Sequence, residues 1–448
     1  MSDRSRYAVT MVSALMLSLL VSTACRSQPE DAKTYGLNPA LAEPEDSLLP
    51  TLNIAEAAGW APGQMPSARE GLTVMAFASG LDHPRWLHVL PNGDVLVAES
   101  QAPPKRAGGF FRNWIEKKVM QRAGAGTRPS ADRIVLLRDT DGDGAADLRS
   151  VYLDGLYSPM GMAVIGEHFY VANADAILRF DYVEGVDQLT GVGRRWVELP
   201  GGPINHHWTK TLLASADGKR LYAAVGSNSN IAERGMEVEQ GRAAIWEIDV
   251  ETGEHRIFAS GLRNPVGMAW ESTSGKLWTV VNERDELGDN LVPDYLTSVK
   301  NGAFYGWPWS YFGQHIDTRV EPSNPVMASK AIRPDFAVGA HTASLGLADS
   351  KGNALGAEYS QGMFVAQHGS WNRSSPSGYK VIFVPFSKGK PIEKWVEVLD
   401  AFLNGDGEAR GRPVGLAIDD QGALLVADDV GNTIWRVRAS TKHELAKP

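Results

Sequence analysis

The chain has 448 residues, of which 43% are hydrophobic and 22% are charged, and its formal net charge is −9. This is the composition of a globular protein with ample material for a core, and the acidic balance argues against general affinity for nucleic acid. The 46 glycines, 25 prolines and 13 tryptophans favour many turns and a fold rich in β-strands.

The first part of the chain has the pattern of an export signal. A short stretch with two arginines precedes an apolar run, and Cys25, the only cysteine, follows that run directly. The pattern predicts a signal over residues 1–25 and an exported, periplasmic lipoprotein, anchored to the membrane by a lipid on Cys25. A plain cleaved signal and an uncleaved anchor helix are the alternatives, because Ser22 stands where an aliphatic residue is usual. Residues 26–68 are rich in Pro, Ala and Glu and predict a tether.

Six short apolar runs recur along residues 69–440, and each ends in polar or small residues. They are VLVAES (95–100), FYVANA (169–174), LYAAVG (221–226), LWTVVN (277–282), MFVAQH (363–368) and LLVADD (424–429). Turn dipeptides and further β-like runs flank them, so each unit is predicted to be a strand, a tight turn, a strand, a loop and another strand. Six such units predict an all-β, six-bladed β-propeller with loop insertions, and a sandwich or a parallel solenoid is the structural alternative.

The polar ends of these runs are candidates for a binding site. They are Glu99, Asn173, Ser227, Asn282, His368 and Asp428. Equivalent positions of propeller blades form a ring around the central channel, so we expect these side chains at one channel mouth, where a small molecule could bind. Solvation of a loop is the alternative for any single member.

Two neighbouring histidines, His206 and His207, precede the strand of the third unit. Alternation along an extended segment predicts that they point to opposite sides, so that only one faces the channel. A neutral imidazole is a general base near pH 7, and a structural histidine is the alternative. The motifs HExxH, CxxC and GxSxG and the phosphate-binding loop are absent from the sequence, so hydrolase, thiol-redox and nucleotidase functions lack their usual support.

The segment RGRPVGL places Arg410 and Arg412 two residues apart, on one face of an extended stretch. Two guanidinium groups side by side suit an anion with several carboxylates. A pair of surface arginines is the alternative.

Two acidic segments offer oxygen ligands for Ca²⁺. The first follows the fourth run and contains Glu283, Asp285, Glu286 and Asp289. The second is DTDGDGAADLRS, in which positions 1, 3, 5 and 9 of a calcium loop are Asp139, Asp141, Asp143 and Asp147. Ser150 stands where such a loop has its final glutamate, so a plain acidic turn is the alternative there.

In combination these motifs resemble those of the exported PQQ-dependent sugar dehydrogenases. The motifs are GLRNPVGMAW, the acidic loop that reaches YGWP, QHGSWNR, RGRPVGL and the histidine before the third strand. The resemblance covers about residues 70–440 and is strongest to the sorbosone-dehydrogenase-like branch, related to soluble quinoprotein glucose dehydrogenase and the aldose sugar dehydrogenases. It implies an enzyme that uses PQQ and Ca²⁺ to oxidise a sugar or sugar-derived aldehyde, and that passes electrons to a quinone or cytochrome.

The resemblance also implies roles for individual residues. His207, not His206, matches the base that takes the proton of the substrate hydroxyl. Arg410 and Arg412 match the pair that binds the PQQ carboxylates, and Asn282 falls on a position that contacts the cofactor.

The same resemblance implies two calcium sites. The backbone carbonyls of Glu283 and Arg284 fall where the family binds the ion that sits on PQQ. Asp289 and the carbonyl of Tyr305 match a second, structural ion.

Three positions depart from the glucose-enzyme pattern. Asn230 stands where that enzyme has an arginine beside the quinone, and Leu156 stands where it has a glutamine near the substrate. The cofactor lysine of the fifth blade has no clear match, so His368 or Arg373 is expected to replace it. These departures leave the identity of the substrate open. Two other functions are the alternatives: a non-catalytic propeller that binds a glycan or protein, and a metal-dependent lactonase without PQQ.

Overall fold

The computed structural model describes residues 34–45, 51–104, 124, 129–392, 394–441 and 444. The predicted export signal and Cys25 lie outside the described residues. Across the described ranges, no helix is both long enough and apolar enough to span a membrane.

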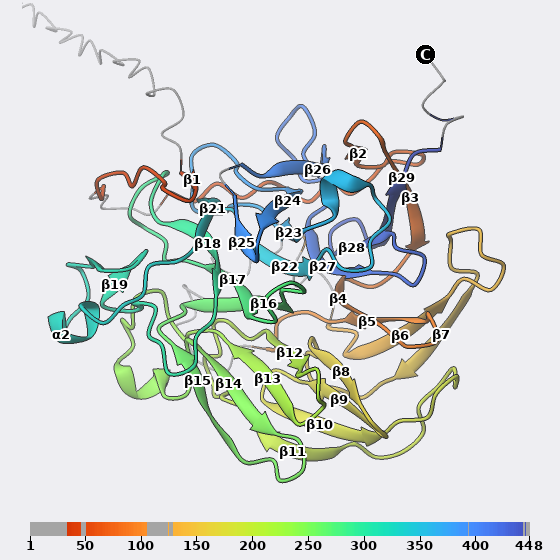
Figure 1. Cartoon of the computed structure of the whole chain (residues 1–448), viewed down its shortest axis with the longest axis horizontal. Helices are drawn as coiled ribbons and strands as arrows, with labels where there is room; N and C mark the ends of the chain where they lie inside the picture. Colours follow the sequence, from red (N-terminus) through yellow and green to blue (C-terminus); the bar gives the residue numbers. More distant parts are fainter. Residues whose placement is uncertain are drawn as a thin grey trace, which may run out of the picture.

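Six antiparallel sheets follow one another around a central axis, which confirms the predicted six-bladed β-propeller (Figure 1). In blades 1 to 3 the chain runs from the innermost strand to the outermost one. Blade 1 contains β4 (Pro84–Val89), β5 (Val95–Glu99), β6 (Arg133–Arg138) and β7 (Leu148–Leu153). Blade 2 contains β8 (Met162–Ile165), β9 (His168–Ala172), β10 (Ala176–Asp181) and β11 (Arg194–Glu198). Blade 3 contains β12 (Lys210–Ala214), β13 (Arg220–Val225), β14 (Ala244–Asp249) and β15 (His255–Ser260).

Blades 4 to 6 carry additional short strands. Blade 4 contains β16 (Asn264–Trp270), β17 (Leu277–Asn282), β18 (Pro293–Ser298) and β21 (Phe336–Ala340), with β1 (Tyr35–Gly36) on its outer edge. Blade 5 contains β22 (Ser344–Asp349), β23 (Gly362–Gln367), β24 (Lys380–Ser387) and β26 (Val396–Asp400), with β2 (Ser67–Ala68) outermost and β25 (Lys390–Pro391) paired with β24. Blade 6 contains β27 (Pro413–Ile418), β28 (Leu424–Asp428), β29 (Thr433–Ala439) and β3 (Leu72–Ser79).

The remaining elements are short. An insertion between β18 and β21 contains β19 (Ser310–Tyr311), β20 (His315–Ile316) and α2 (Pro325–Ala328). The side chain of Asn324 accepts the Met327 N–H and thereby caps α2. Two 3₁₀ turns, η1 (Met236–Glu239) and η2 (Ala357–Tyr359), lie in loops of blades 3 and 5.

Blade 6 closes the ring with strands from both ends of the chain. The early strand β3 pairs antiparallel with the late strand β29, from Leu72 opposite Ala439 to Ser79 opposite Thr433. Figure 1 shows the two strands side by side, although they are more than 350 residues apart in sequence. The backbone hydrogen bonds between β3 and β29 thus join the two ends of the chain in one blade and hold the ring closed.

The glycine that recurs in the first strand of the repeats has a packing role. A side chain there would meet the neighbouring blade at less than 3 Å, because adjacent inner strands approach closely around the axis. The four positions are Gly161 against Leu212, Gly267 against Leu347, Gly346 against Val414 and Gly415 against Arg85. The repeated glycine thus lets the innermost strands form a narrow ring.

The hydrophobic core is divided among the blade interfaces. Five clusters of buried apolar side chains each combine residues of two adjacent blades, and a sixth joins blades 1 and 2 and also contains Val266, Leu345 and Val414 from the inner strands of blades 4 to 6. The cluster between blades 5 and 6, for example, joins Phe364 and Phe383 to Leu424 and Trp435. Since every blade packs on two neighbours, the strand ends that carry the polar residues are held at fixed positions.

The prediction of a tether over residues 26–68 is wrong for the part that the structure describes. Residues 34–45 and 51–68, called here the N-terminal segment, pack on the propeller. Tyr35–Gly36 pairs with β21, and Ser67–Ala68 pairs with β26. Their backbone extends two sheets, and this interaction depends on free sheet edges rather than on the polar composition from which the tether was predicted.

Candidate active site

The channel mouth, called here the mouth, is the end of the ring at which the second strand of each blade finishes. The six polar residues predicted to surround it all end or follow a second strand, so they do lie at the same end. Their environments differ, however, and decide which of them are available to a ligand.

Two of the six residues, Glu99 and Asp428, make structural contacts within the protein. Glu99 is buried and accepts a hydrogen bond from Arg133 Nε at 2.5 Å. Asp428 accepts the indole N–H groups of Trp60 (2.7 Å) and Trp435 (3.0 Å), and burial raises its pKa to about 6. The prediction that the whole polar ring serves a ligand is therefore wrong for these two carboxylates.

His207 has the arrangement of a general base. Its Nδ1 lies 2.9 Å from the carbonyl oxygen of Ser227. Because a carbonyl only accepts, Nδ1 carries the proton and the lone pair is on Nε2. Burial, and then the proximity of His206 and Arg263, lowers the pKa of His207 well below its usual value. The ring is therefore neutral at pH 7 and able to accept a proton.

The prediction that the two histidines point to opposite sides is wrong. The rings of His206 and His207 meet edge to face, with their centroids 4.6 Å apart. The segment is bent rather than extended, since Asn205 has a φ of 39° and the backbone N–H of His206 donates to Asn228 Oδ1 (3.1 Å). His206 is exposed, whereas His207 is half-buried.

Lys210 stabilises this bent segment by hydrogen bonds, a role that was not predicted from the sequence. Its Nζ donates to the carbonyls of His207 (3.2 Å) and Trp208 (2.9 Å) and contacts Asn205 Oδ1 at 3.4 Å. Burial lowers the pKa of Lys210 well below its usual value. Lysine in a strand is ordinarily a surface residue, so the sequence offers no signal for this use.

Arg263 joins the predicted cofactor positions of blades 3 and 4. It is buried and donates to Asn230 Oδ1 (2.9 Å), to the carbonyl of Glu283 (2.6 Å) and to Asp285 Oδ2 (3.0 Å). Asn282 lies beside this group, and its side chain donates to Ser344 of blade 5. Arg263 belongs to the GLRNPVGMAW motif, but no role was predicted for it.

The predicted calcium ligands Glu283 and Arg284 lie at the mouth but do not form a complete site. The Glu283 carbonyl already accepts a hydrogen bond from the positively charged guanidinium of Arg263. The Arg284 side chain points elsewhere, into a buried ion pair with Asp317 at 3.1 Å. A calcium ion here would need further anionic oxygens, because two neutral carbonyls beside a cation hold it poorly.

The two residues of the predicted second calcium site have different neighbours. Asp289 accepts hydrogen bonds from the backbone N–H and the hydroxyl of Ser374, in blade 5. Tyr305 is tied to blade 3, where its N–H donates to the carbonyl of Ser260 at 2.9 Å. These contacts do not bring Asp289 and Tyr305 together, so the second site stays a prediction.

The two arginines of RGRPVGL differ in environment. Arg412 is buried, donates to the carbonyl of Ala55 in the N-terminal segment (3.0 Å), and lies over the ring of Tyr379 at 4.9 Å. Arg410 is half-buried, and its backbone N–H donates to the carbonyl of Phe402. Part of the Arg412 donor capacity is thus used by the protein itself.

A second charged group lies at the mouth between blades 1, 5 and 6. Asp429 is buried and pairs with Arg85, while His368 Nε2 lies at 2.9 Å and His83 at 3.5 Å from its carboxylate. Burial would raise the pKa of Asp429, but these three neighbours outweigh it and hold the pKa well below its usual value. The Arg85 guanidinium also lies 5.8 Å from the ring of Trp208, which connects this group to the histidine segment.

His368 and Arg373, the two candidates to replace the fifth-blade lysine, contact different parts of the protein. His368 faces the mouth group, and burial lowers its pKa to about 4, so that it is neutral at pH 7. Arg373 donates to Asn290 Oδ1 at 3.1 Å, in the loop after β17. Leu156, at the position of a substrate-binding glutamine, is buried in the cluster between blades 1 and 2.

The DTDGDG loop lies at the opposite end of the propeller. The carboxylates of Asp139, Asp141 and Asp143 approach one another within 4.8 Å, the one such acidic group among the described residues. Asp147, the fourth predicted ligand, instead accepts the N–H and hydroxyl of Thr140. Three of four predicted ligands therefore gather, and calcium binding there stays a prediction.

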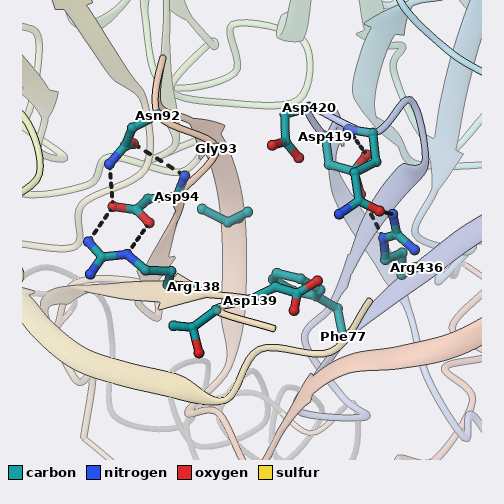
Figure 2. Close-up of a pocket in the computed structure, with 12 residues that line it drawn as sticks. Phe77, Asn92, Gly93, Asp94, Arg138, Asp139, Asp419, Asp420 and Arg436 are labelled. Atoms are coloured by element: carbon teal, nitrogen blue, oxygen red, sulfur yellow. Dashed lines mark hydrogen bonds and ion pairs between the residues drawn. The ribbon is translucent and has the colours of Figure 1, made fainter. Parts of the chain in front are cut away.

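A cavity of about 320 Å³ opens beside this loop, between blades 1 and 6 (Figure 2). Asp94 and Arg138 form a two-pronged ion pair on one side, at 2.6 and 2.7 Å, and Asp419 and Arg436 form a second pair on the other. Each pair lies within one blade, Asp94 and Arg138 in blade 1 and Asp419 and Arg436 in blade 6, so these charges stabilise the blades on either side of the cavity.

The family described as Domain of unknown function (DUF7133) matches residues 69–370. The chain belongs to this family. A second family, described as TrAA12-like, matches residues 312–440.

Two relatives match parts of the chain. A pyrroloquinoline quinone-dependent pyranose dehydrogenase of Coprinopsis cinerea is 24% identical over 440 residues, which is 84% of this chain and 55% of the relative. An uncharacterized protein of Borreliella burgdorferi is 31% identical over 241 residues, 53% of this chain and 62% of the relative. The chain thus spans less than two thirds of the length of these relatives.

Solved structures share the fold. The PQQ domain of the C. cinerea pyranose dehydrogenase, in its holo form, matches with a TM-score of 0.66 and 21% identity over 86% of this chain and 100% of that domain. A calcium structure of a Trichoderma reesei family AA12 protein gives 0.67 and 19%, over 87% and 99% of the two chains. A PQQ-bound aldose sugar dehydrogenase of Streptomyces coelicolor gives 0.54 and 16%, over 84% and 100%. The resemblance to the PQQ-dependent sugar dehydrogenases is thereby confirmed for the fold.

Proposed function

We propose that this protein is a PQQ-dependent dehydrogenase that oxidises a sugar or sugar-derived aldehyde of the aldose or sorbosone class. The observation that carries the proposal is the state of His207: the Ser227 carbonyl fixes its proton on Nδ1, which leaves Nε2 as the atom that can accept a proton. A base of this kind is what the oxidation of a hydroxyl requires, because the hydroxyl proton must leave as the carbon is oxidised.

The charges of the mouth suit an anionic cofactor. Arg85, Arg263 and Arg412 are all buried there, and the Nε atoms of Arg85 and Arg412 have no hydrogen-bond partner among the described residues. Buried guanidinium donors without partners are unfavourable unless a ligand completes them. Together with Arg410 they would hold the carboxylates of PQQ by charge-assisted hydrogen bonds.

The chain's own residues supply the proton chemistry. PQQ, when bound, would supply a quinone that accepts the hydride of the substrate carbon, that is, two electrons and one proton. His207 Nε2 accepts the proton of the substrate hydroxyl, and Lys210 fixes the His207 backbone so that the imidazole keeps its position. His206 shapes the same pocket, because its ring lies against His207.

Calcium enters the proposal as a partner of the cofactor. The carbonyls of Glu283 and Arg284 would bind the ion only together with the anionic oxygens of PQQ, so metal and cofactor should raise each other's affinity by the same factor. Calorimetric titration of the metal-free protein with PQQ, with and without Ca²⁺, measures this coupling. Equal PQQ affinity in both buffers would exclude an ion on the cofactor.

The export pattern extends the proposal to the route of the electrons. A protein anchored through Cys25 in the periplasm would pass electrons to a quinone or cytochrome of the same membrane. Deletion of residues 1–25, followed by fractionation of cells, would move the protein from the membrane fraction to the cytoplasm if these residues export it.

The direct test is reduction of a dye by the PQQ- and Ca²⁺-loaded protein with a panel of aldoses and sugar-derived aldehydes. Sugar-dependent reduction that requires PQQ supports the proposal. Hydrolysis of a lactone without PQQ would favour the lactonase alternative, and glycan binding without turnover would favour a non-catalytic propeller.

A further inference from the structure

A second cavity, of about 540 Å³, opens at the mouth end of blades 1 to 3. It is separate from the cavity of Figure 2, which lies at the other end of the propeller. Its lining residues are Pro103, Pro104, Tyr157, Asp175, Arg195, Gly201, Gly202, Pro203, Ile204 and Asn205. Its volume is within the range of roughly 300–1,000 Å³ that is usual for small-molecule sites.

The cavity shares a wall with the proposed catalytic histidine. Residues 200–208 connect β11 to β12, and this single segment carries both the lining residues Gly201 to Asn205 and His207. Arg242 donates to the carbonyls of Pro200 (2.7 Å) and Gly201 (2.6 Å). Since Lys210 holds the other half of the segment, the wall is fixed between the two sites.

Asn205 is the residue at which the two sites meet. Its amide donates to the carbonyl of Ala174 (3.1 Å), and its Oδ1 accepts from Arg242 Nη2 (3.0 Å). It lines the cavity and lies two residues before His207. A ligand whose reacting end is at His207 would therefore extend naturally toward the cavity.

The chemistry of the lining matches a sugar unit. Asp175 and Arg195 form an ion pair at 3.3 Å, and Asp175 Oδ1 is buried without a hydrogen-bond partner among the described residues. Arg195 also donates to Glu198 from Nε (2.9 Å) and Nη2, so the Asp175 carboxylate is the acceptor that the cavity offers to the hydroxyl groups of a sugar. Tyr157, half-buried on the opposite connection, offers a ring on which the C–H face of a pyranose packs.

We infer that this cavity binds a second sugar unit of the substrate, so that the enzyme acts on oligosaccharides whose terminal unit is oxidised at His207. The inference rests on the proposed function for the oxidised unit, but binding in the cavity does not depend on PQQ. A substrate of one sugar ring, bound at His207, would leave this polar and aromatic cavity unfilled.

The test compares glucose with maltotriose and cellotriose on the PQQ-loaded protein. Wild type should oxidise at least one trisaccharide with a kcat/KM about tenfold or more above that for glucose, through a lower KM. Tyr157→Ala and Asp175→Asn should remove this preference, because each deletes a contact to the second unit, and leave kcat/KM for glucose within about twofold. The control is Asp181→Asn, at the exposed far end of β10, which should behave as wild type.

A parallel calorimetric titration of PQQ-free protein with the same trisaccharides separates the two proposals. Trisaccharide binding that Tyr157→Ala abolishes supports the cavity even where the loaded protein oxidises no sugar, an outcome that would overturn only the dehydrogenase proposal. Equal losses for glucose and trisaccharides in both variants, or trisaccharide affinity unchanged by both, would overturn the cavity proposal.

Discussion

The protonation of His207 is set by an atom that no side-chain substitution removes. Its Nδ1 bonds to the backbone carbonyl of Ser227, while the Ser227 hydroxyl donates to the carbonyl of Ser229 at 2.7 Å. The tautomer is therefore a property of the backbone bend, and the imidazole itself is the group to vary. His206, which touches His207 but is exposed, provides the matched comparison.

His207→Ala should lower turnover by about 100-fold or more while PQQ remains bound, since the substitution removes a general base. His206→Ala should have a much smaller effect. Steady-state kinetics with measured PQQ occupancy check both. Because the pKa of His207 is lowered, the base stays deprotonated as the pH falls through the usual histidine range, and wild-type activity should decline only at more acidic pH. Equal losses in the two variants would contradict the assignment.

Arg410→Ala and Arg412→Ala should each weaken PQQ binding by about 10- to 150-fold, since a charge-assisted contact contributes about 1.5–3 kcal/mol. Arg412→Ala should also lower the melting temperature, because it removes the bond to Ala55 and the contact with Tyr379. Fluorescence titration with PQQ and thermal unfolding separate the two effects. Unchanged PQQ affinity in both variants would place the carboxylate site elsewhere.

At the scale of elements, the loop that begins after β17 contains the backbone carbonyls predicted to bind Ca²⁺ and also buried carboxyl groups. Glu283 is 4% exposed, and burial raises its pKa to about 7; burial likewise raises the pKa of Asp294 to about 6. The Asp294 carboxylate accepts the Glu283 N–H at 2.9 Å, so the two groups brace the same turn. Both carboxyls bind protons more tightly in the folded protein than in the unfolded chain.

The contribution of these two carboxyls to folding stability should therefore fall as the pH rises, whereas the lowered pKa values of His207 and His368 contribute stability that grows with pH. For a raised carboxyl pKa the extra stability is complete below the unfolded value, near 4.5 for Glu283, and is lost as the pH passes about 7. Glu283 should account for about 2–3 kcal/mol of that change. Urea unfolding of wild type and Glu283→Gln between pH 4.5 and 8 measures it, because the difference between the two free-energy profiles should change by this amount. Two profiles with the same dependence on pH would contradict the account.

The N-terminal segment acts as a structural element of the ring. Trp60 packs edge-on against Phe402 and Trp435 and donates to Asp428, which caps the start of blade 6. Trp60→Ala should cost about 3 kcal/mol in the free energy of unfolding, since it removes aromatic packing and one donor to a buried carboxylate. Trp371→Ala, at a more exposed tryptophan, should cost under about 1 kcal/mol in the same denaturation experiment. An equal loss of unfolding free energy in the two variants would contradict a specific structural role for Trp60.

At the scale of the whole molecule, the repeated pattern of strands was sufficient to predict the propeller, because apolar alternation and tight turns are local properties. The location of the mouth was predicted, and His207 was predicted to be the general base there. The partners Arg263, Lys210 and Asp429 were not assigned roles, since their roles arise from contacts between different blades. The packing of the N-terminal segment was missed for the same reason, because sheet edges form only when the ring closes.

The central claim is that the mouth binds PQQ and lets a sugar reduce it. The most direct measurement is the absorbance of PQQ bound to the Ca²⁺-loaded protein, followed after anaerobic mixing with aldoses, trisaccharides and sugar-derived aldehydes. The account predicts that at least one of these substrates converts the spectrum of the bound cofactor to that of its reduced form, rapidly in wild type and about 100-fold more slowly in His207→Ala. A protein that fails to bind PQQ, or a bound cofactor whose spectrum none of these substrates changes, would contradict it.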